Sequence, residues 1–194
     1  MLKKIFFVVL LSLSSLIFAR DITEIKSLSF DVAETNLTRE KKSTVRYSID
    51  IKLPSTIKKV IYFPEINKGE QYIYKGTNKT VYIPAFNQIK HTETDGDENL
   101  IVEAIKKILQ EYKQNTTFRN DYEEQKVLNV SLNERNGIGI QSYQVVDENI
   151  LPKTIYIYDG KNKIFELSIA DVQTNLDFSD EHFTVHKSEN EAEK

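Results

Sequence analysis

Apolar and polar residues alternate over much of the chain. Val45, Tyr47, Ile49 and Ile51 are each followed by a charged or hydroxyl-bearing residue, which is the period of a strand with one buried face. Similar short runs, ended by prolines, glycines or Asn/Asp turn signals, occur at 28–32, 57–63, 70–75, 79–83, 127–132, 139–146, 154–158, 163–169 and 182–186. The pattern predicts about nine to eleven strands, with hairpin turns at Asn136-Gly137 and Asp159-Gly160.

One segment has a helical period instead. Its apolar residues recur three or four positions apart, and charged residues fill the other face: Leu100, Ile101, Ala104, Ile105, Ile108, Leu109 and Tyr112 form the apolar stripe. This predicts an amphipathic helix of about four turns, the only helix that the pattern indicates. The polar segment 91–99 before it is predicted to be a loop in which Asp95 or Asp97 caps the helix.

These elements predict an α+β, mainly β fold. The strands lack the intervening helices of βαβ units, so the sheet is expected to be antiparallel. So many strands do not form a flat sheet, and the sheet should curl. The helix would then bury its apolar face against the concave side. No linker divides the chain, which predicts one domain over 20–187 and a polar tail over 188–194.

The first residues have the layout of a secretory signal peptide. Lys3 and Lys4 precede an apolar run over 5–18, and Ala19 is followed by a charged pair. The run is shorter than the roughly 20 residues of a membrane-spanning helix. We expect an exported chain whose residues 1–19 are removed and which is not held in a membrane. N-terminal sequencing of the mature protein should begin near Arg20, and an intact Met1 would contradict this.

Composition narrows the chemistry. The 194 residues carry a net charge of −3 and include no cysteine, which excludes disulfides, thiolate zinc sites, thiol nucleophiles and cysteine lipidation. The basic residues are dispersed, which argues against nucleic acid as a partner. No Gly-x-Ser-x-Gly, His-Glu-x-x-His or phosphate-binding glycine loop occurs. The sequence therefore indicates no catalytic residue and no cofactor.

Two groups of residues have side chains of the types that bind metal ions. His182 and His186 would share one face of a helix, but their segment alternates like a strand, which favours ordinary polar residues. Asp95, Asp97 and Glu98 lack the ligand order of an EF-hand, which favours helix capping over calcium binding. No metal site is predicted.

The aromatic and apolar strand residues have two interpretations. They form an ordinary core, or they form the wall of a cavity between the curled sheet and the helix, and the pattern alone does not decide. The residues predicted to line such a cavity are Phe30, Val32, Tyr47, Ile49, Ile51, Val60, Tyr62, Tyr72, Tyr74, Val81, Ile83, Ile101, Ile105, Ile108 and Tyr112. Acyl chains suit a cavity of this kind, since each buried methylene contributes about 0.8 kcal/mol.

Several segments together resemble the LolA-like periplasmic lipoprotein-sorting family. The resemblance lies in Ile25–Val32, Tyr47–Pro54 with its Lys-x-Pro ending, Lys59–Phe63, the Gly-led strand 69–74 with its aromatics, Val81–Pro84, Leu151–Tyr158 and Phe165–Asn175 with the Phe178–Phe183 end. It covers most of the mature chain without one specific motif. The chain departs from the family at Leu53, where an arginine is typical, and in the short segment 21–27, where a longer amphipathic helix is typical.

This resemblance implies an unclosed barrel with a helical lid over an apolar cavity. It implies a periplasmic, non-enzymatic carrier or chaperone for the acyl chains of lipoproteins or lipids. The implied partners are an inner-membrane exporter and an outer-membrane acceptor. An envelope sensor of the same fold is the alternative, and a secreted hydrolase is the least favoured.

Overall fold

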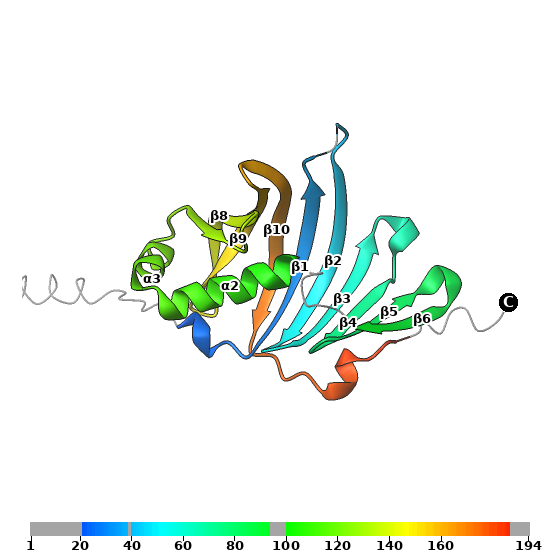
Figure 1. Ribbon diagram of the computed structural model, residues 1–194. Coiled ribbons are helices and arrows are strands. Elements are labelled where there is room, and N and C mark those ends of the chain that lie inside the picture. The colour runs from blue at the N-terminus through cyan, green and yellow to red at the C-terminus, as the bar shows by residue number, and fades with distance from the viewer. Residues whose placement is uncertain (1–20, 39, 94–99, 187–194) are drawn as a thin grey trace, which may run out of the picture.

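The computed structural model describes residues 21–38, 40–93 and 100–186. Ten antiparallel strands form one strongly curved sheet (Figure 1). The strands are β1 (Ser27–Asn36), β2 (Ser43–Lys52), β3 (Thr56–Phe63), β4 (Gln71–Lys75), β5 (Asn78–Ile83), β6 (Gln88–Glu93), β7 (Leu128–Ser131), β8 (Asn136–Val146), β9 (Asn149–Asp159) and β10 (Asn162–Thr174). The helices are α2 (Leu100–Gln114), α3 (Thr116–Glu123) and the short 3-10 turns η1 (Ile22–Glu24), η2 (Glu65–Asn67), η3 (Pro84–Phe86) and η4 (Asp180–Phe183).

The path of the chain explains where α2 lies. The strand order is β6-β5-β4-β3-β2-β1-β10-β9-β8-β7, so the chain runs outward from β1 to one edge of the sheet and returns from the other edge to β1. The connection from β6 to β7 must therefore cross the whole sheet, and α2 crosses it on the concave side (Figure 1). The two edge strands do not pair with each other, so the sheet is an unclosed barrel. This confirms the predicted fold class.

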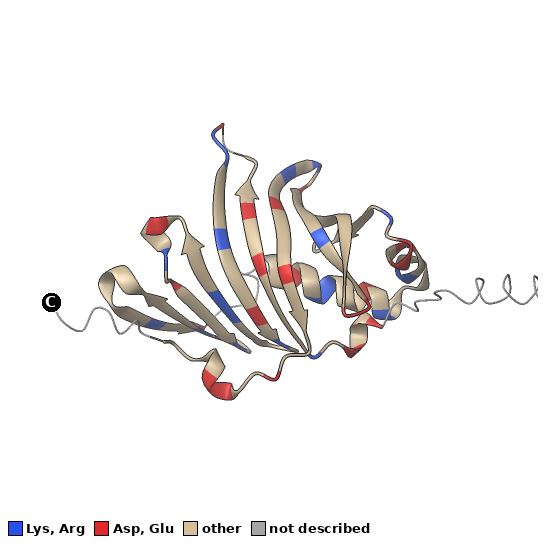
Figure 2. Ribbon diagram, turned by 180° about the vertical axis from the view of Figure 1, so that it is seen from behind, with Lys and Arg blue, Asp and Glu red and all other residues tan. Residues whose placement is uncertain are grey.

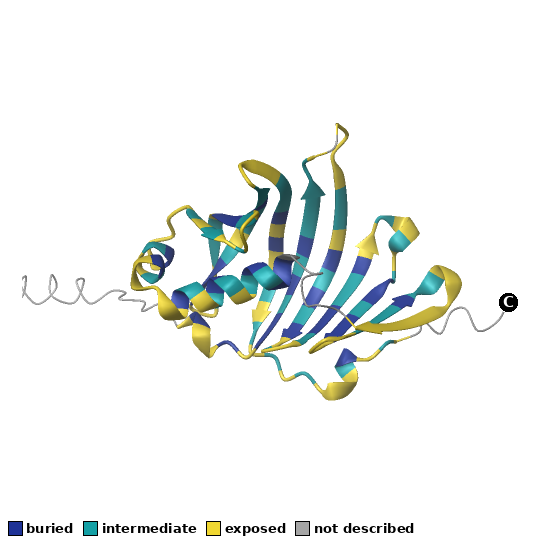
Figure 3. Ribbon diagram, in the orientation of Figure 1, coloured by how far each residue is buried: buried dark blue, intermediate teal, exposed yellow. Residues whose placement is uncertain are grey.

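The register places the core on the concave face. Phe30 lies opposite Ile49 and Val32 lies opposite Tyr47, so their side chains share that face. Buried and exposed positions alternate along the central strands (Figure 3). Burying each large aliphatic side chain contributes about 1.5–3 kcal/mol. The buried concave residues of the strands from β8 to β2 include Leu28, Phe30, Val32, Tyr47, Ile49, Ile51, Ile138, Ile140, Leu151, Ile155, Ile157, Leu167 and Ile169.

Two elements are absent from the sequence-based prediction. The edge strand β6 occupies part of the predicted loop, and all six of its residues are exposed, so it lacks the apolar alternation that marks a half-buried strand. The short helix α3 is capped by Asn115, whose side chain accepts a hydrogen bond from the backbone N–H of Phe118. The Asp95 and Asp97 caps and the Asp95, Asp97 and Glu98 cluster lie outside the described residues.

Two local predictions are wrong. Asn136 and Gly137 begin β8 rather than forming a turn, and the chain reverses at 132–135 before them. Residues 182–186 do not form a strand. His182 lies in the 3-10 turn η4, and the side chain of Ser179 caps this turn. The predicted Asp159-Gly160 turn does join β9 to β10. The β8–β9 turn is made instead by Asp147 and Glu148, both with positive φ.

The segment that contains η4 is fastened to the convex face of the sheet. The ring Nε2 of His182 lies 2.7 Å from Asp50 Oδ2, and Ser29 Oγ donates to Asp50 Oδ1 at 2.6 Å. Lys58 Nζ donates to the carbonyl oxygen of His182 at 2.8 Å. The side chain of Gln71 makes two hydrogen bonds with the backbone of His186. Both His182 and His186 therefore take part in contacts that hold this segment against the sheet.

Asp50→Asn is expected to lower the free energy of unfolding by about 1–2 kcal/mol, because the carboxylate accepts two side-chain hydrogen bonds in a partly buried site. Asp180→Asn is the matched control. Asp180 pairs with Lys52 at 3.3 Å, but its side chain is almost fully exposed, so its removal should change stability by less than about 0.5 kcal/mol. Equal effects of both variants in urea unfolding would contradict the assigned role.

Candidate functional site: the groove between α2 and the sheet

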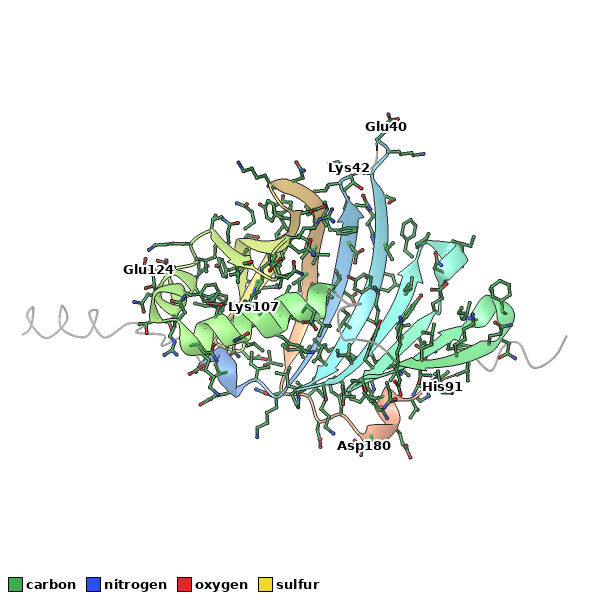
Figure 4. All side chains as sticks on the ribbon, viewed as in Figure 1. Glu40, Lys42, His91, Lys107, Glu124 and Asp180 are labelled. Atoms are coloured by element: carbon green, nitrogen blue, oxygen red, sulfur yellow. The ribbon has the colours of Figure 1, made fainter. Side chains whose placement is uncertain are left out.

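The inner face of α2 is apolar along its whole length. Ile101, Val102, Ala104, Ile108 and Tyr112 are buried, and the partly buried Ile105 and Leu109 pack against the same core. The outer face carries charged residues such as Lys107 (Figure 4), which pairs with Glu111 at 3.0 Å. The sequence pattern therefore located both the helix and its buried side correctly.

A small apolar cavity lies where α2 meets the strands. Its volume is about 40 Å³. Ligand pockets of drug-sized molecules are about 300–1,000 Å³, so in this conformation α2 closes the groove against a chain-like ligand. The cavity is lined by Ile22, Ile25, Leu28, Phe30, Ile105, Ile108, Leu109, Tyr122, Leu151, Pro152, Ile169 and Val172. The only polar side-chain group of this set, the Tyr122 hydroxyl, donates to the carbonyl oxygen of Ile150 at 2.9 Å.

The C-terminal end of α2 is anchored by aromatic rings. Tyr122 of α3 makes edge-to-face contacts with Tyr112 of α2 and with Tyr143 of β8, at centroid distances of 5.4 Å and 5.1 Å. The Tyr112 hydroxyl donates to Glu123 at 2.7 Å, and Arg119 Nε donates to the Tyr112 carbonyl at 3.0 Å. This end of α2 is thus joined to α3 and through it to β8 and β9.

Most of the residues predicted to line a cavity do lie on the concave face. The β1 and β2 residues Phe30, Val32, Tyr47, Ile49 and Ile51 share one surface under or beside α2. The register extends this surface to Tyr72 and Tyr74 of β4 and to Val81 and Ile83 of β5. Ile101, Ile105, Ile108 and Tyr112 face it from α2. Of the set, Phe30, Ile105 and Ile108 directly line the small cavity.

Val60 and Tyr62 are exceptions. They alternate with Ile61, whose partner across β2 is Tyr47, so they point to the convex face. Burial and the neighbouring Asp31 carboxylate, which is also on that face, raise the pKa of Tyr62. These two residues are therefore not part of the groove.

The sequence-based list also omitted residues of the cavity wall. Leu28, Ile169, Leu151 and Tyr122 come from four different elements, and a period along one strand does not indicate which strands meet under the helix. Leu28 was nevertheless in phase with Phe30 and Val32, which is a signal that could have identified it.

The open half of the concave face, over β3 to β5, differs from the half under α2. Lys59 lies in the same cross-strand row as Ile49 and Tyr72. Its ammonium is 3.8 Å from the centroid of the Tyr47 ring, and burial lowers the pKa of Lys59. The Tyr47 hydroxyl donates to Glu34 Oε2 at 2.8 Å. The concave face thus passes from an apolar surface under α2 to one made of tyrosines, lysines and carboxylates.

The described residues contain neither a cluster of metal ligands nor a helix that could span a membrane. Within 21–38, 40–93 and 100–186, no three His, Asp or Glu side chains gather closely enough to hold a metal ion. In the same ranges, none of the helices has the length and apolar character needed to cross a bilayer. His91, on the edge strand β6 (Figure 4), makes a 3.1 Å hydrogen bond with Thr80. Seen from the convex side, charged residues of both signs are interspersed (Figure 2).

Two solved structures have a similar fold. A LolA superfamily protein from Nitrosomonas europaea superposes with a TM-score of 0.56 at 14% identity, over 86% of this chain and 95% of that one. A DUF1329 family protein from Desulfovibrio piger gives a TM-score of 0.56 at 10% identity, over 82% and 90% of the two chains. The chain has a LolA-like fold.

A third structure agrees with this assignment. A domain from Vibrio parahaemolyticus, described as an outer membrane lipoprotein-sorting protein, gives a TM-score of 0.52 at 11% identity over 81% of this chain and 88% of its own. No protein-family model and no curated protein sequence matches the chain. Among the described residues before β1, which are 21–26, the 3-10 turn η1 is the helical element, and Leu53 packs partly buried against the core.

Proposed function

We propose that this protein is a periplasmic, non-enzymatic carrier that binds the acyl chains of lipoproteins or lipids between α2 and the concave face of the sheet. The observation that carries the proposal is the apolar stripe of α2 laid across an apolar concave surface, with a small apolar cavity of about 40 Å³ between them. A ligand-free carrier of acyl chains must cover its binding surface, because a large exposed apolar surface promotes association with other proteins.

The anchored C-terminal end of α2 and its partly buried middle suit the helix to act as a lid. Its C-terminal end is held by the Tyr112, Tyr122 and Tyr143 rings, whereas Ile105 and Leu109 in its middle are only partly buried over the cavity. Entry of an acyl chain would require the apolar contacts of the middle and N-terminal turns to separate. The ligand would then replace those contacts with its own methylenes, which limits the net cost of opening.

A donor and an acceptor need a surface to contact, and the end of the sheet that carries the β3–β4 and β5–β6 connections offers one. Ile66 of the β3–β4 connection and Phe86 of the β5–β6 connection are 83% and 70% exposed. The two connections are neighbours, since a Cβ on Gly69 would come within 3.2 Å of Pro84. Large exposed apolar side chains placed together are typical of interaction sites. We infer that these two connections contact an exporter and an acceptor.

Native mass spectrometry of protein purified from its own periplasm tests the proposal. We expect a population that carries additional mass equal to acyl lipid or lipidated peptide, lost on mild activation. Protein found there without such a species, and unable to bind a neutral fluorescent probe such as N-phenylnaphthylamine, would contradict the carrier function. That result would favour a sensor that uses the same fold to contact a protein partner.

A further inference from the structure

Lys59 is a cationic side chain placed on an otherwise apolar row of the sheet. The row runs from Lys59 of β3 through Ile49 of β2 to Phe30 of β1, which lines the cavity under α2. Adjacent strands are about 4.8 Å apart, so Lys59 lies about 10 Å from the strand that carries Phe30. A lysine here is partly removed from water and lies on the same concave face as Phe30.

Among the described residues, Lys59 contacts aromatic rings and donates no hydrogen bond. An ammonium has three donors. Within the described part of the chain, the contacts of this one are with aromatic rings: Tyr47 at 3.8 Å and Tyr72 at 6.0 Å from the ring centroids. It forms no salt bridge with any described carboxylate, and burial lowers its pKa.

The carboxylates that interact electrostatically with Lys59 are those of Glu34 and Glu70, and both accept hydrogen bonds from other side chains. Glu34 accepts the Tyr47 hydroxyl at 2.8 Å. Glu70 accepts the Tyr72 hydroxyl at 2.6 Å and the Asn67 side-chain amide at 2.7 Å. The tyrosines therefore orient both carboxylates, and the Lys59 ammonium is left over a ring face. An additional anionic oxygen would supply an acceptor that the described residues do not offer to this ammonium.

A second lysine stands on the other side of Tyr72. Lys79 of β5 lies 5.9 Å from the centroid of the Tyr72 ring and 5.7 Å from that of Tyr74. The register places Lys79 on the concave face, opposite Tyr74. Two cations thus flank one aromatic ring, at the end of an apolar path that leads under α2.

We propose that the ligand is an amphiphile with an anionic head group, a phosphate or a carboxylate, which binds at Lys59 with Lys79 beside it, while its chain extends along Ile49 and Phe30 into the groove. This rests on the proposed function and adds the chemical class of the head group. The alternative role for Lys59 is a purely structural cation–π contact that covers Tyr47. The two differ in whether the charge of the head group affects binding.

Displacement of N-phenylnaphthylamine by three amphiphiles with the same chain tests this. Dodecyl phosphate and dodecanoate are anionic, and dodecyl maltoside is uncharged. On the wild-type protein, we expect at least one anionic amphiphile to bind about tenfold more tightly than dodecyl maltoside, and the two anions distinguish a phosphate from a carboxylate site. Lys59→Met should remove that preference and leave dodecyl maltoside binding within about twofold. Lys75→Met, at an exposed position on the convex face, is the matched control and should retain the preference.

Equal binding of all three amphiphiles by the wild-type protein would overturn the head-group assignment while leaving the carrier function standing. An anionic preference that survives Lys59→Met would overturn the role of Lys59. Failure of every amphiphile to displace the probe, or of the probe to bind, would contradict the carrier function and this inference together. The wild-type comparison does not depend on the folding of the variant, which circular dichroism checks separately.

Discussion

Ile105→Asp is expected to weaken binding of a neutral apolar probe by about tenfold or more while the sheet stays folded. Ile105 lies in the middle of α2, is only partly buried, and lines the cavity. An aspartate there would face apolar side chains, and an unpaired carboxylate in such surroundings costs several kcal/mol. The helix avoids that cost if it separates from the sheet, and the groove then loses one of its walls.

Urea unfolding followed by far-UV circular dichroism and N-phenylnaphthylamine binding are to be measured on the same variant. Gln110→Asp, on the exposed face of the same helix, is the control for helix propensity and added charge. If Ile105→Asp unfolds the sheet in parallel with the loss of binding, α2 is part of an ordinary core. If neither stability nor probe binding changes, the helix has no part in binding.

Tyr122→Ala is expected to lower the free energy of unfolding by about 3–5 kcal/mol, the largest stability effect anticipated in this protein. Tyr122 is fully buried, contacts the rings of Tyr112, Phe118 and Tyr143, and donates to the carbonyl of Ile150. Its removal creates a cavity where α2, α3 and the strands meet. Small domains are stable by only about 5–15 kcal/mol, so the variant should be marginally folded.

Tyr122→Phe keeps the ring and removes the hydroxyl, which should cost about 1 kcal/mol. The difference between the two variants in urea unfolding therefore separates ring packing from the hydrogen bond to Ile150. A loss from Tyr122→Ala as small as that from Tyr122→Phe would show that the aromatic cluster does not anchor the helices.

The longer elements with one buried face could be predicted from the sequence, whereas a strand with no buried face and a very short helix could not. In β2, Tyr47, Ile49 and Ile51 are all buried on one side, and the period of two is clear. The edge strand β6 has every residue exposed, so no alternation exists to detect. In α3, a single turn of amphipathicity depends on Phe118 and Tyr122, which is too short a pattern to distinguish from chance.

β3 shows why the predicted site was partly out of phase. Ile57 and Ile61 face the groove, whereas Val60 and Tyr62 face the convex side. Lysines occur on both sides, since Lys59 faces the groove and Lys58 donates to the carbonyl of His182. The segment around η4 covers the second face, so neither side of β3 is plainly polar. Such a strand has no periodic signal from which to choose the face, and Lys59 was consequently missed.

The unpaired edges of the sheet bear on how large a ligand the groove can hold. In a closed barrel, strand number and shear fix the radius. Here β6 and β7 end the sheet without meeting, and the only described covalent route between them runs through α2 and α3. The curvature of the sheet can therefore relax without breaking any hydrogen bond between neighbouring strands. In the carrier proposed above, the capacity of the groove would then be set by bending of the sheet and not by a fixed circumference, and one protein would accommodate acyl chains of different length and number.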